Sequence, residues 1–276
     1  MIRLLAFSFW ASILLMLPLP VLAAELAWSP TLLERSVDRE REFLAFTQWL
    51  REQSGVPLSL LLEPDYEQMV NKFVRDEVAM LWVGPAVLQQ LMQQRPDSQI
   101  LAMTKDKQGK TVYQCILVTR QEYQGTPAQA FSRSVALTQP MSTCGSVGAK
   151  VLAQSIGVSA QQLHGKFTGS HQNVITTIML GEAVSGIIAP QVFERYAWLP
   201  IKAIATSPPL PSFVWVVNPR LVDSAQQQAL VKAFATSDRA STSHQWYVAF
   251  RDGFETDAVA IQHAISQLTE QGVLGR

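Results

Sequence analysis

Short apolar runs of strand length alternate with segments of helical periodicity along most of this chain. The runs predict buried strands, and apolar residues at every third or fourth position predict helices that bury one face. In the first half the expected elements are 57–62, 65–76, 78–83, 85–95, 99–104 and 113–119. In the second half they are 134–138, 148–156, 166–168, 172–180, 184–189, 201–205, 213–217, 223–236 and 256–271. This alternation, with its short connections, predicts an α/β fold.

Two short polar stretches each stand directly before a predicted helix. Ser142-Thr143-Cys144-Gly145 precedes 148–156, and Gly169-Ser170-His171 precedes 172–180. A helix N-terminus carries free N–H groups and the positive end of the helix dipole, so hydroxyls placed there can help to bind an anion. Two such termini facing one cavity would form an oxyanion site without a metal or an arginine. The alternative is that the serines and the threonine only cap helices, each stabilising its helix by about 1 kcal/mol.

Length and charge narrow the class of protein. The 276 residues can bury a large core, and 22 basic residues are balanced by 22 acidic ones. The sequence has no stripe of basic residues that could bind a phosphate backbone, so nucleic acid is not an expected partner. His164, His244 and His263 have no metal-ligand spacing with His171. We therefore predict no metal and no cofactor, and we expect a monomer.

The N-terminal segment has the features of a cleavable signal peptide. Arg3 is the only charged residue before Glu25, the segment 4–17 is almost wholly apolar, and small residues near Ala23 fit a cleavage site. Retention as a membrane anchor is the alternative, but the apolar run is shorter than the ~20 residues that span a bilayer. The sequence thus predicts a signal peptide at 1–23 and a mature protein in the bacterial periplasm.

Five motifs, taken together, resemble those of the periplasmic phosphate/phosphite/phosphonate-binding proteins of ABC transporters. In chain order they are Asp65-Tyr66, Leu81-Trp82-Val83-Gly84-Pro85, Tyr113, Ser142-Thr143-Cys144-Gly145 and Gly169-Ser170-His171. The resemblance extends from about Glu25 to the final helices. It implies a two-lobed type II periplasmic-binding fold, with a hinge of two crossing strands and a ligand cleft between the lobes. The implied lobes are 24–117 with 213–276, and 118–212.

The resemblance also implies which residues bind the ligand. Tyr66 and Tyr113 match aromatic residues that cover the ligand upon closure, and Trp82 is expected in the core beside the cleft. The polar stretches would donate hydrogen bonds to a tetrahedral oxyanion. The expected ligand-binding residues are Tyr66, Tyr113, Ser142, Thr143, Cys144, Gly145, Ser170 and His171. His171 titrates near neutral pH, so binding could be linked to its protonation.

The implied function is capture of a small phosphorus oxyanion for an ABC transporter permease, without turnover. A ligand sensor that feeds a membrane receptor is the alternative. Family members that take an aminoalkylphosphonate tend to have an aspartate shortly after the second site helix, where this chain has Val184. The resemblance therefore implies that the ligand is phosphite, phosphate, methylphosphonate or a phosphonate with an apolar tail. The alternative is that Glu182 pairs with an ammonium group of the ligand.

Both cysteines of the chain fall near the implied cleft. Cys144 stands where the family usually has a hydroxyl, and Cys115 follows Tyr113 by two residues. In an oxidising periplasm two cysteines suggest a disulfide, whereas a free Cys144 at a helix start would be a reactive thiol. Both alternatives stay open. A cysteine-dependent hydrolase with Cys144 as nucleophile and His171 as base is the rival function, although no orienting residue for the histidine can be named.

Overall fold

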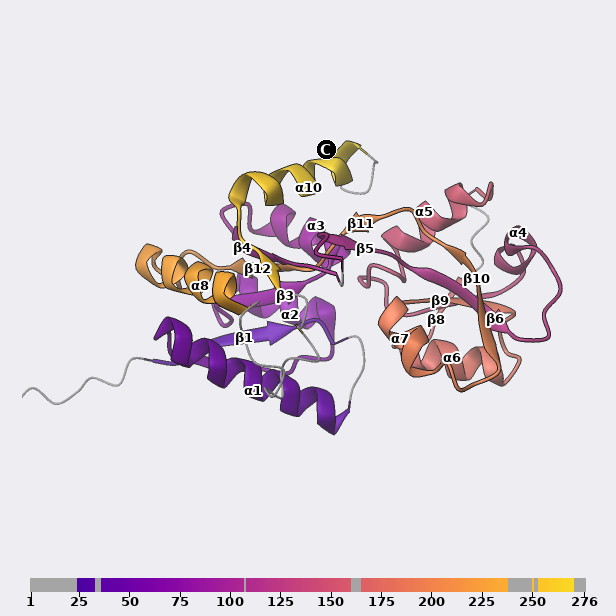
Figure 1. The fold of residues 1–276 in the computed structure, drawn as a ribbon, viewed down its shortest axis with the longest axis horizontal. Helices are drawn as coiled ribbons and strands as arrows, with labels where there is room; N and C mark the ends of the chain where they lie inside the picture. Colours follow the sequence, from indigo (N-terminus) through magenta and orange to yellow (C-terminus); the bar gives the residue numbers. More distant parts are fainter. Residues whose placement is uncertain are drawn as a thin grey trace, which may run out of the picture.

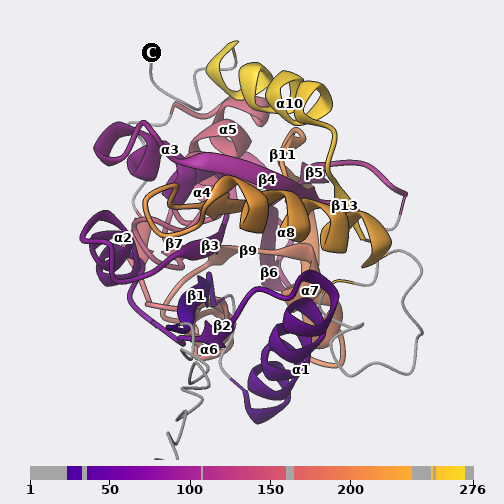
Figure 2. The same ribbon diagram turned by 90° about the vertical axis from the view of Figure 1, so that its left-hand side faces the viewer.

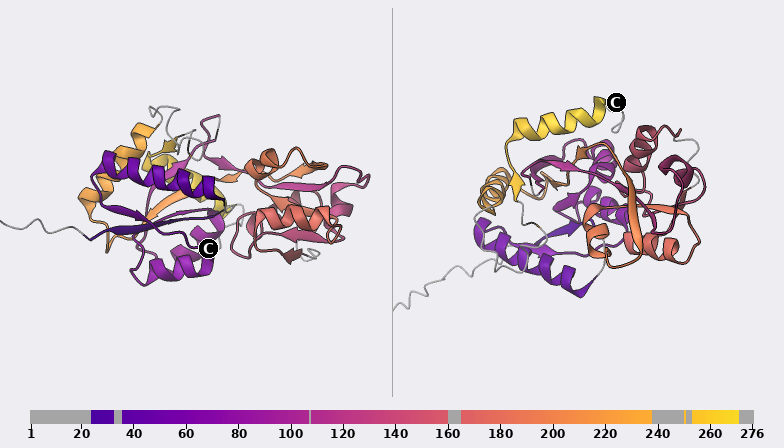
Figure 3. Two further views of the ribbon diagram at one scale, coloured as in Figure 1. Left: turned by 90° about the horizontal axis from the view of Figure 1, so that it is seen from below. Right: turned by 45° about the vertical axis from the view of Figure 1, so that its right-hand side comes forward.

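The protein consists of two bodies joined by a narrow connection (Figures 1 and 3). The computed structural model describes residues 24–32, 36–106, 108–159, 165–237, 250 and 253–270. The predicted signal peptide at 1–23, like His164 and His244, lies outside these ranges. Both bodies combine a sheet with helices on its faces, so the α/β fold class predicted from the sequence is confirmed.

The first body is built on a six-stranded sheet with the order β13-β4-β12-β3-β1-β2. Its strands are β1 (Leu26–Pro30), β2 (Leu58–Leu60), β3 (Met80–Val83), β4 (Gln99–Thr104), β12 (Val214–Val217) and β13 (Phe254–Glu255). Strand β1 pairs in parallel with β2 and β3, and β12 lies antiparallel to β3 and β4. The first body therefore uses chain segments from both sides of the second body.

Helices cover both faces of this sheet (Figure 2). They are α1 (Val37–Ser54), α2 (Tyr66–Val74), α3 (Pro85–Gln94), α8 (Ser224–Thr236) and α10 (Ala258–Glu270). Helix α1 packs against α8 over an aromatic core that contains Trp28, Phe46 and Trp215. On the opposite face, α2, α3 and α10 enclose a second cluster around Phe73 and Leu81. In the described residues no helix combines the length and the apolar character needed to cross a bilayer.

The second body is built on a five-stranded sheet with the order β10-β6-β9-β7-β8. Its elements are β6 (Ile116–Arg120), α4 (Pro127–Phe131), β7 (Val135–Leu137), α5 (Val147–Ser155), β8 (Gly165–Phe167), α6 (His171–Met179), β9 (Ser185–Ile188), α7 (Pro190–Arg195) and β10 (Ile201–Thr206). Strand β7 runs parallel to both β8 and β9. The carboxyl ends of these three strands consequently meet at one edge of the sheet.

The chain passes between the bodies through a small antiparallel ribbon of β5 (Val112–Tyr113) and β11 (Leu210–Pro211). The predicted strand 113–119 is therefore divided into β5 and β6. The division falls at Cys115, whose N–H donates to Ser207 Oγ and whose carbonyl accepts from the Ser207 N–H. These bonds turn the chain from the ribbon into the second sheet.

Local sequence signals explain where several helices begin and end. The Asp65 side chain accepts from the N–H groups of Glu67 and Gln68 at the start of α2, as its motif predicted. Helix α8 starts with a capping box formed by Asp223 and Gln226. Helix α1 ends at Gly55, whose φ of 69° is the left-handed conformation that glycine adopts without strain. These helix ends are therefore specified by neighbouring residues in the sequence and do not depend on packing between distant segments.

Candidate functional site

The two polar stretches lie side by side at the carboxyl ends of β7, β8 and β9. The N–H of Gly169 donates to the Thr138 carbonyl over 2.9 Å, and the N–H of Ala189, directly after β9, donates to His171 Nδ1 over 3.1 Å. Ligands of α/β folds bind preferentially at this edge because the strands end there and helices start there. The structure thus brings Gly169-Ser170-His171 next to the strand that leads into Ser142-Thr143-Cys144-Gly145.

The stretch 142–145 forms what we call the anion loop. Ser142 and Thr143 are each 4% exposed, and the Gly148 N–H donates to the Thr143 carbonyl over 2.7 Å. Among the described residues, nothing accepts a hydrogen bond from the N–H groups of Thr143, Cys144 and Gly145. Helix α5 begins at Val147 without a side-chain cap, so the hydroxyls of Ser142 and Thr143 do not cap it. The anion loop therefore presents several uncommitted donors.

Close packing keeps the anion loop against the end of β7. A Cβ atom added at Gly145 would stand 2.7 Å from Thr138 Oγ1 and even closer to the Gln139 carbonyl, so only glycine fits there. Thr138 is buried, and its hydroxyl has no hydrogen-bond partner within the described part of the chain. Buried polar groups normally have a partner. The Thr138 hydroxyl is thus a further free donor beside the loop.

His171 is the first residue of α6 and is buried. Its Nδ1 accepts from the Ala189 N–H, so the neutral imidazole carries its proton on Nε2, and that nitrogen has no partner in the described ranges. Burial lowers the pKa of His171 to about 3. The side chain is consequently a neutral donor at physiological pH in the ligand-free protein. Protonation on binding would require the anion to raise this pKa by several units.

Ser170 acts as the N-cap of α6. Its Oγ accepts from the Asn173 N–H over 3.0 Å. Ser170 therefore does cap its helix, as the alternative interpretation predicted. The hydrogen of its hydroxyl can still be donated to a ligand. Ser142 and Ser170 thus differ, because only Ser170 stabilises a helix through its side chain.

Cys115 and Cys144 form a disulfide, with their Cα atoms 5.5 Å apart. The bond ties the anion loop to the residue that precedes β6, and Gly148 packs against the Cys115 sulfur. Cys144 has no thiol, so the hydrolase hypothesis with a Cys144 nucleophile is wrong, as is the alternative of a reactive free thiol. Cys144 therefore has no S–H to donate, and its backbone N–H is its one hydrogen-bond donor.

Tyr113 contacts the anion loop and Tyr66 is a neighbour of Tyr113, but both hydroxyls already donate. Tyr66 donates to the Leu32 carbonyl over 2.9 Å, and Tyr113 donates to the Cys144 sulfur over 3.5 Å. Burial raises the pKa of both phenols, and that of Tyr113 is raised further by the neighbouring Tyr66. Both side chains can therefore wall the site, while each keeps only an acceptor oxygen free.

The two bodies touch next to this wall. A Cβ atom added at Gly84, the N-cap residue of α3, would stand 2.6 Å from Thr143 Oγ1 and 3.1 Å from the Phe213 ring. Trp82 is buried as expected, and its ring nitrogen donates to Thr104 Oγ1. The Thr143 hydroxyl thus reaches the backbone at the start of α3. Thr138 and the buried Thr31 were not among the predicted site residues, although a hydroxyl directly after a strand was the available signal.

The prediction that Val184 stands where an ammonium group of the ligand would be bound is wrong. Val184 precedes β9, and its N–H donates to Ser134 at the start of β7. The site lies at the other end of these strands, about 13 Å away at ~3.3 Å per residue. Glu182 lies in the same distant turn and is exposed. The residue that follows β9 next to His171 is Ala189, which carries no charge.

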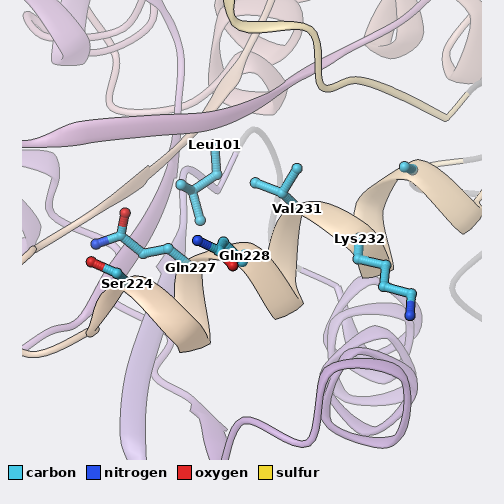
Figure 4. Close-up of a pocket in the computed structure, with 7 residues that line it drawn as sticks. Leu101, Ser224, Gln227, Gln228, Val231 and Lys232 are labelled. Carbon is cyan, nitrogen blue, oxygen red and sulfur yellow. The ribbon is translucent and has the colours of Figure 1, made fainter.

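A second hollow in the described part of the chain lies away from the predicted site residues. Figure 4 shows a hollow between β4 and α8, lined by Leu101, Ser224, Gln227, Gln228, Val231, Lys232 and Ala235, with none of the predicted site residues. Within the described ranges, no three His, Cys, Asp or Glu side chains gather where they could hold a metal ion. The edge of the second sheet therefore remains the candidate site.

Solved structures of low sequence identity share this fold. PhnD1 from Prochlorococcus marinus, in complex with methylphosphonate, is 16% identical with a TM-score of 0.76, covering 89% of this chain and 97% of its own. A binding protein component of an ABC phosphonate transporter from Pseudomonas aeruginosa is 17% identical, with a TM-score of 0.69 and coverage of 90% and 87%. The alkanesulfonate-binding protein SsuA from Xanthomonas axonopodis pv. citri, bound to MOPS, is 13% identical, with a TM-score of 0.64 and coverage of 92% and 96%. The two bodies are thus the lobes of a type II periplasmic-binding fold.

No curated protein sequence matches the chain significantly. The family model of the phosphonate ABC transporter periplasmic substrate-binding protein matches residues 28–257, which is most of the chain. Proteins of this kind bind a substrate for transport and are not enzymes. This chain belongs to the family of periplasmic substrate-binding proteins of phosphonate ABC transporters.

Proposed function

We propose that this protein captures a small tetrahedral phosphorus oxyanion, such as phosphite, phosphate or a phosphonate, by closing its two lobes around it. The observation that carries the proposal is the set of buried donors without partners at one sheet edge. They are the N–H groups of residues 143–145, the Thr138 hydroxyl and His171 Nε2. Each would be costly to leave unpaired, by about 1–3 kcal/mol, and an oxyanion can accept from all of them.

The donors favour a ligand without a positively charged tail. Every donor named above is neutral, and the rings of Phe213 and Trp82 pack in a row beside Tyr113. No carboxylate stands at Ala189, next to His171, to pair with an ammonium group. PhnD1, a relative of the same fold, is in complex with methylphosphonate. Phosphite, phosphate and methylphosphonate are therefore preferred over 2-aminoethylphosphonate.

The remaining parts of the proposal concern processing and partners. Residues 1–23 would be removed as a signal peptide, leaving a monomer whose lobes divide at the ribbon of β5 and β11, with Ile116 and Leu117 in the second lobe. The closed, loaded form would dock on the permease of an ABC transporter. A membrane-bound sensor that recognises the same closed form is the alternative recipient.

Calorimetric titration of the mature protein tests the proposed ligand class. The probes are phosphite, phosphate, methylphosphonate and 2-aminoethylphosphonate, with methanesulfonate as an isosteric anion that cannot carry a second charge. Binding of at least one of the first three, without turnover, is expected. Lack of binding to every phosphorus probe would overturn the proposal, and preference for 2-aminoethylphosphonate would overturn the argument from neutral donors.

A further inference from the structure

A second set of unsatisfied polar groups lies in the first lobe, across from the anion loop. Helix α3 begins with Gly84 and Pro85, and no side chain caps it. The first helical hydrogen bond is donated by Leu88 to the Gly84 carbonyl. Within the described part of the chain, the N–H groups of Ala86 and Val87 in the first turn have no acceptor. By itself an uncapped helix start of this kind is common.

The buried side chain of Thr31 makes this helix start unusual. Thr31 follows β1, is 3% exposed, and has a hydroxyl without a hydrogen-bond partner in the described part of the chain. Its N–H donates to the Trp82 carbonyl over 2.8 Å, which places it beside the end of β3, two residues before Gly84. Thr31 is therefore a neighbour of the strand end that leads into α3.

Strand geometry fixes the direction of the Thr31 side chain. Side chains alternate along a strand, so Thr31 points to the same face as Ala27 and Ser29. Ala27 packs against the cluster that α2 and α3 enclose. The neighbouring residue Leu32 accepts the hydroxyl of Tyr66 at the start of α2. Thr31 thus lies beside the end of β3 and next to the residue that binds Tyr66 of α2, and the strand alternation directs its side chain to the face that α2 and α3 cover.

The anion loop approaches this place from the other lobe. Thr143 Oγ1 lies against Gly84, at a point where a methyl group would not fit. Three kinds of donor consequently converge: the Thr31 hydroxyl, the first turn of α3 and the Thr143 hydroxyl. We infer that Thr31 and the N-terminus of α3 form a first-lobe half of the oxyanion site, which binds a ligand oxygen together with Thr143 in the closed protein. This inference rests on the proposed function.

The consequence is that ligand oxygens bridge the two lobes directly. An oxygen held by donors of both lobes stabilises the closed form over the open form, because the open form has only one half of its partners. The ligand would then favour closure through its hydrogen bond to Thr31, and not only through contacts with Tyr66 and Tyr113.

Titration of three first-lobe variants with phosphate and methylphosphonate tests the inference. Thr31→Val keeps the shape and removes the hydroxyl, and should weaken binding roughly 10- to 100-fold, the scale of one hydrogen bond to a charged group. Thr31→Ser keeps the hydroxyl and should bind nearly as the natural protein does. Ser29→Ala is the matched control, since the buried Ser29 hydroxyl also has no partner among the described residues, but Ser29 pairs with Leu81 inside the sheet. It should leave affinity unchanged.

The outcomes separate this inference from the proposed function. If the natural protein binds neither phosphate nor any other phosphorus probe, the proposed function fails. If the natural protein binds and Ser142→Ala weakens binding while Thr31→Val does not, the first-lobe half is overturned and the proposed function stands. Equal losses in Thr31→Val and Ser29→Ala would also overturn the inference, because they would indicate a general effect on the sheet. The melting temperature of each ligand-free variant identifies any that is misfolded.

Discussion

At the scale of residues, the site is defined by which polar atoms already have partners. The hydroxyls of Tyr66 and Tyr113 donate to protein acceptors, and Ser170 accepts from its own helix. By contrast, Thr138 and His171 each keep a buried polar atom without a described partner. Residues of the second kind gain most from a ligand, since it removes an existing penalty. Hydroxyl-bearing residues at this site therefore make unequal contributions to affinity and to stability.

Two serine variants should show this inequality. Ser142→Ala should weaken phosphate or methylphosphonate binding roughly 10- to 100-fold with little change in melting temperature, because its hydroxyl caps no helix. Ser170→Ala should also lower the free energy of unfolding by about 1 kcal/mol, because it removes the cap of α6. Calorimetry and thermal melts of both variants provide the measurement. A lower melting temperature and unchanged affinity in Ser142→Ala would mean that its role is structural.

His171 should make the ligand-free protein less stable in acid. The pKa of His171 is about 3 in the folded protein and near 6.5 when exposed, so between these values the unfolded chain binds more protons. The stability is fully present above pH 6.5 and falls towards pH 3 by up to about 1.4 kcal/mol per pH unit from this group. His171→Asn retains an acceptor for Ala189, and its denaturation midpoint should depend less on pH over this range. Identical pH profiles for both proteins would contradict the buried neutral imidazole.

At the scale of elements, the anion loop is held by a covalent bond as well as by packing. The disulfide joins residues 29 positions apart and connects the loop to the start of β6. Leu210 of the connecting ribbon packs against Val147 and Val151 of α5, the helix that follows the loop. The anion loop, α5 and the ribbon are consequently held together by the disulfide and by these contacts. A change in the loop is expected to alter both the site and the connection between the lobes.

Removal of the disulfide should therefore affect stability and binding together. The double variant Cys115→Ala/Cys144→Ala should lose about 2–4 kcal/mol of unfolding free energy, as expected for a closed loop of this length, and should bind phosphate more weakly. Denatured natural protein should contain no thiols before reduction and two afterwards. Two thiols in the unreduced periplasmic protein would contradict the disulfide. An unchanged affinity in the double variant would mean that packing alone holds the loop.

Helix prediction failed where the apolar pattern was weak. Helix α1 was not predicted, although Ser36 caps it and Gly55 ends it. Its buried face includes the polar Thr47, while Val37 and Leu44 on the same helix are exposed. The buried and exposed positions thus do not follow apolar and polar residues, so the periodicity that reveals an amphipathic helix is blurred. Packing against the aromatic core therefore determines which face of α1 is buried.

At the scale of the whole molecule, the ligand site depends on how closely the two lobes approach. The contact between Gly84 and Thr143 leaves no room for a side chain at position 84. Both lobes also share the ribbon of β5 and β11, which carries Tyr113 into the wall of the site. In the closure that we propose, Gly84 would set how closely the first lobe approaches Thr143, and Tyr113 would be positioned by the ribbon.

Gly84→Ala should hinder closure while leaving each lobe folded. Its added methyl group would meet Thr143 Oγ1 across the cleft and would require a small shift of the Phe213 ring. We expect affinity for phosphate or methylphosphonate to fall at least roughly 10-fold, the effect of ~1.4 kcal/mol. Small-angle scattering should show less ligand-induced compaction than in the natural protein. The melting temperature of the ligand-free variant is the control, and full affinity would show that closure does not use this contact.

The sequence by itself determined the order of most elements, the fold class and the two polar stretches. These depend on local signals, namely strand-length apolar runs, helix caps and glycine stops, which are read within a few residues. The strand 99–104 was predicted to the residue, and α5 and α6 were each placed within one residue. Asp65 was expected to open α2, and it does so through its own side chain.

Only the tertiary structure decided which of these residues face one another and which polar atoms are free. Sequence left the disulfide undecided, because bond formation depends on the distance between Cys115 and Cys144 in the fold. Val184 was placed at the site when Ala189 stands there, because strand direction decides which end meets His171. The charge of His171 likewise depends on burial, which no local pattern records. Contacts between distant segments, unlike caps and periodicity, are set by how sheets and lobes pack.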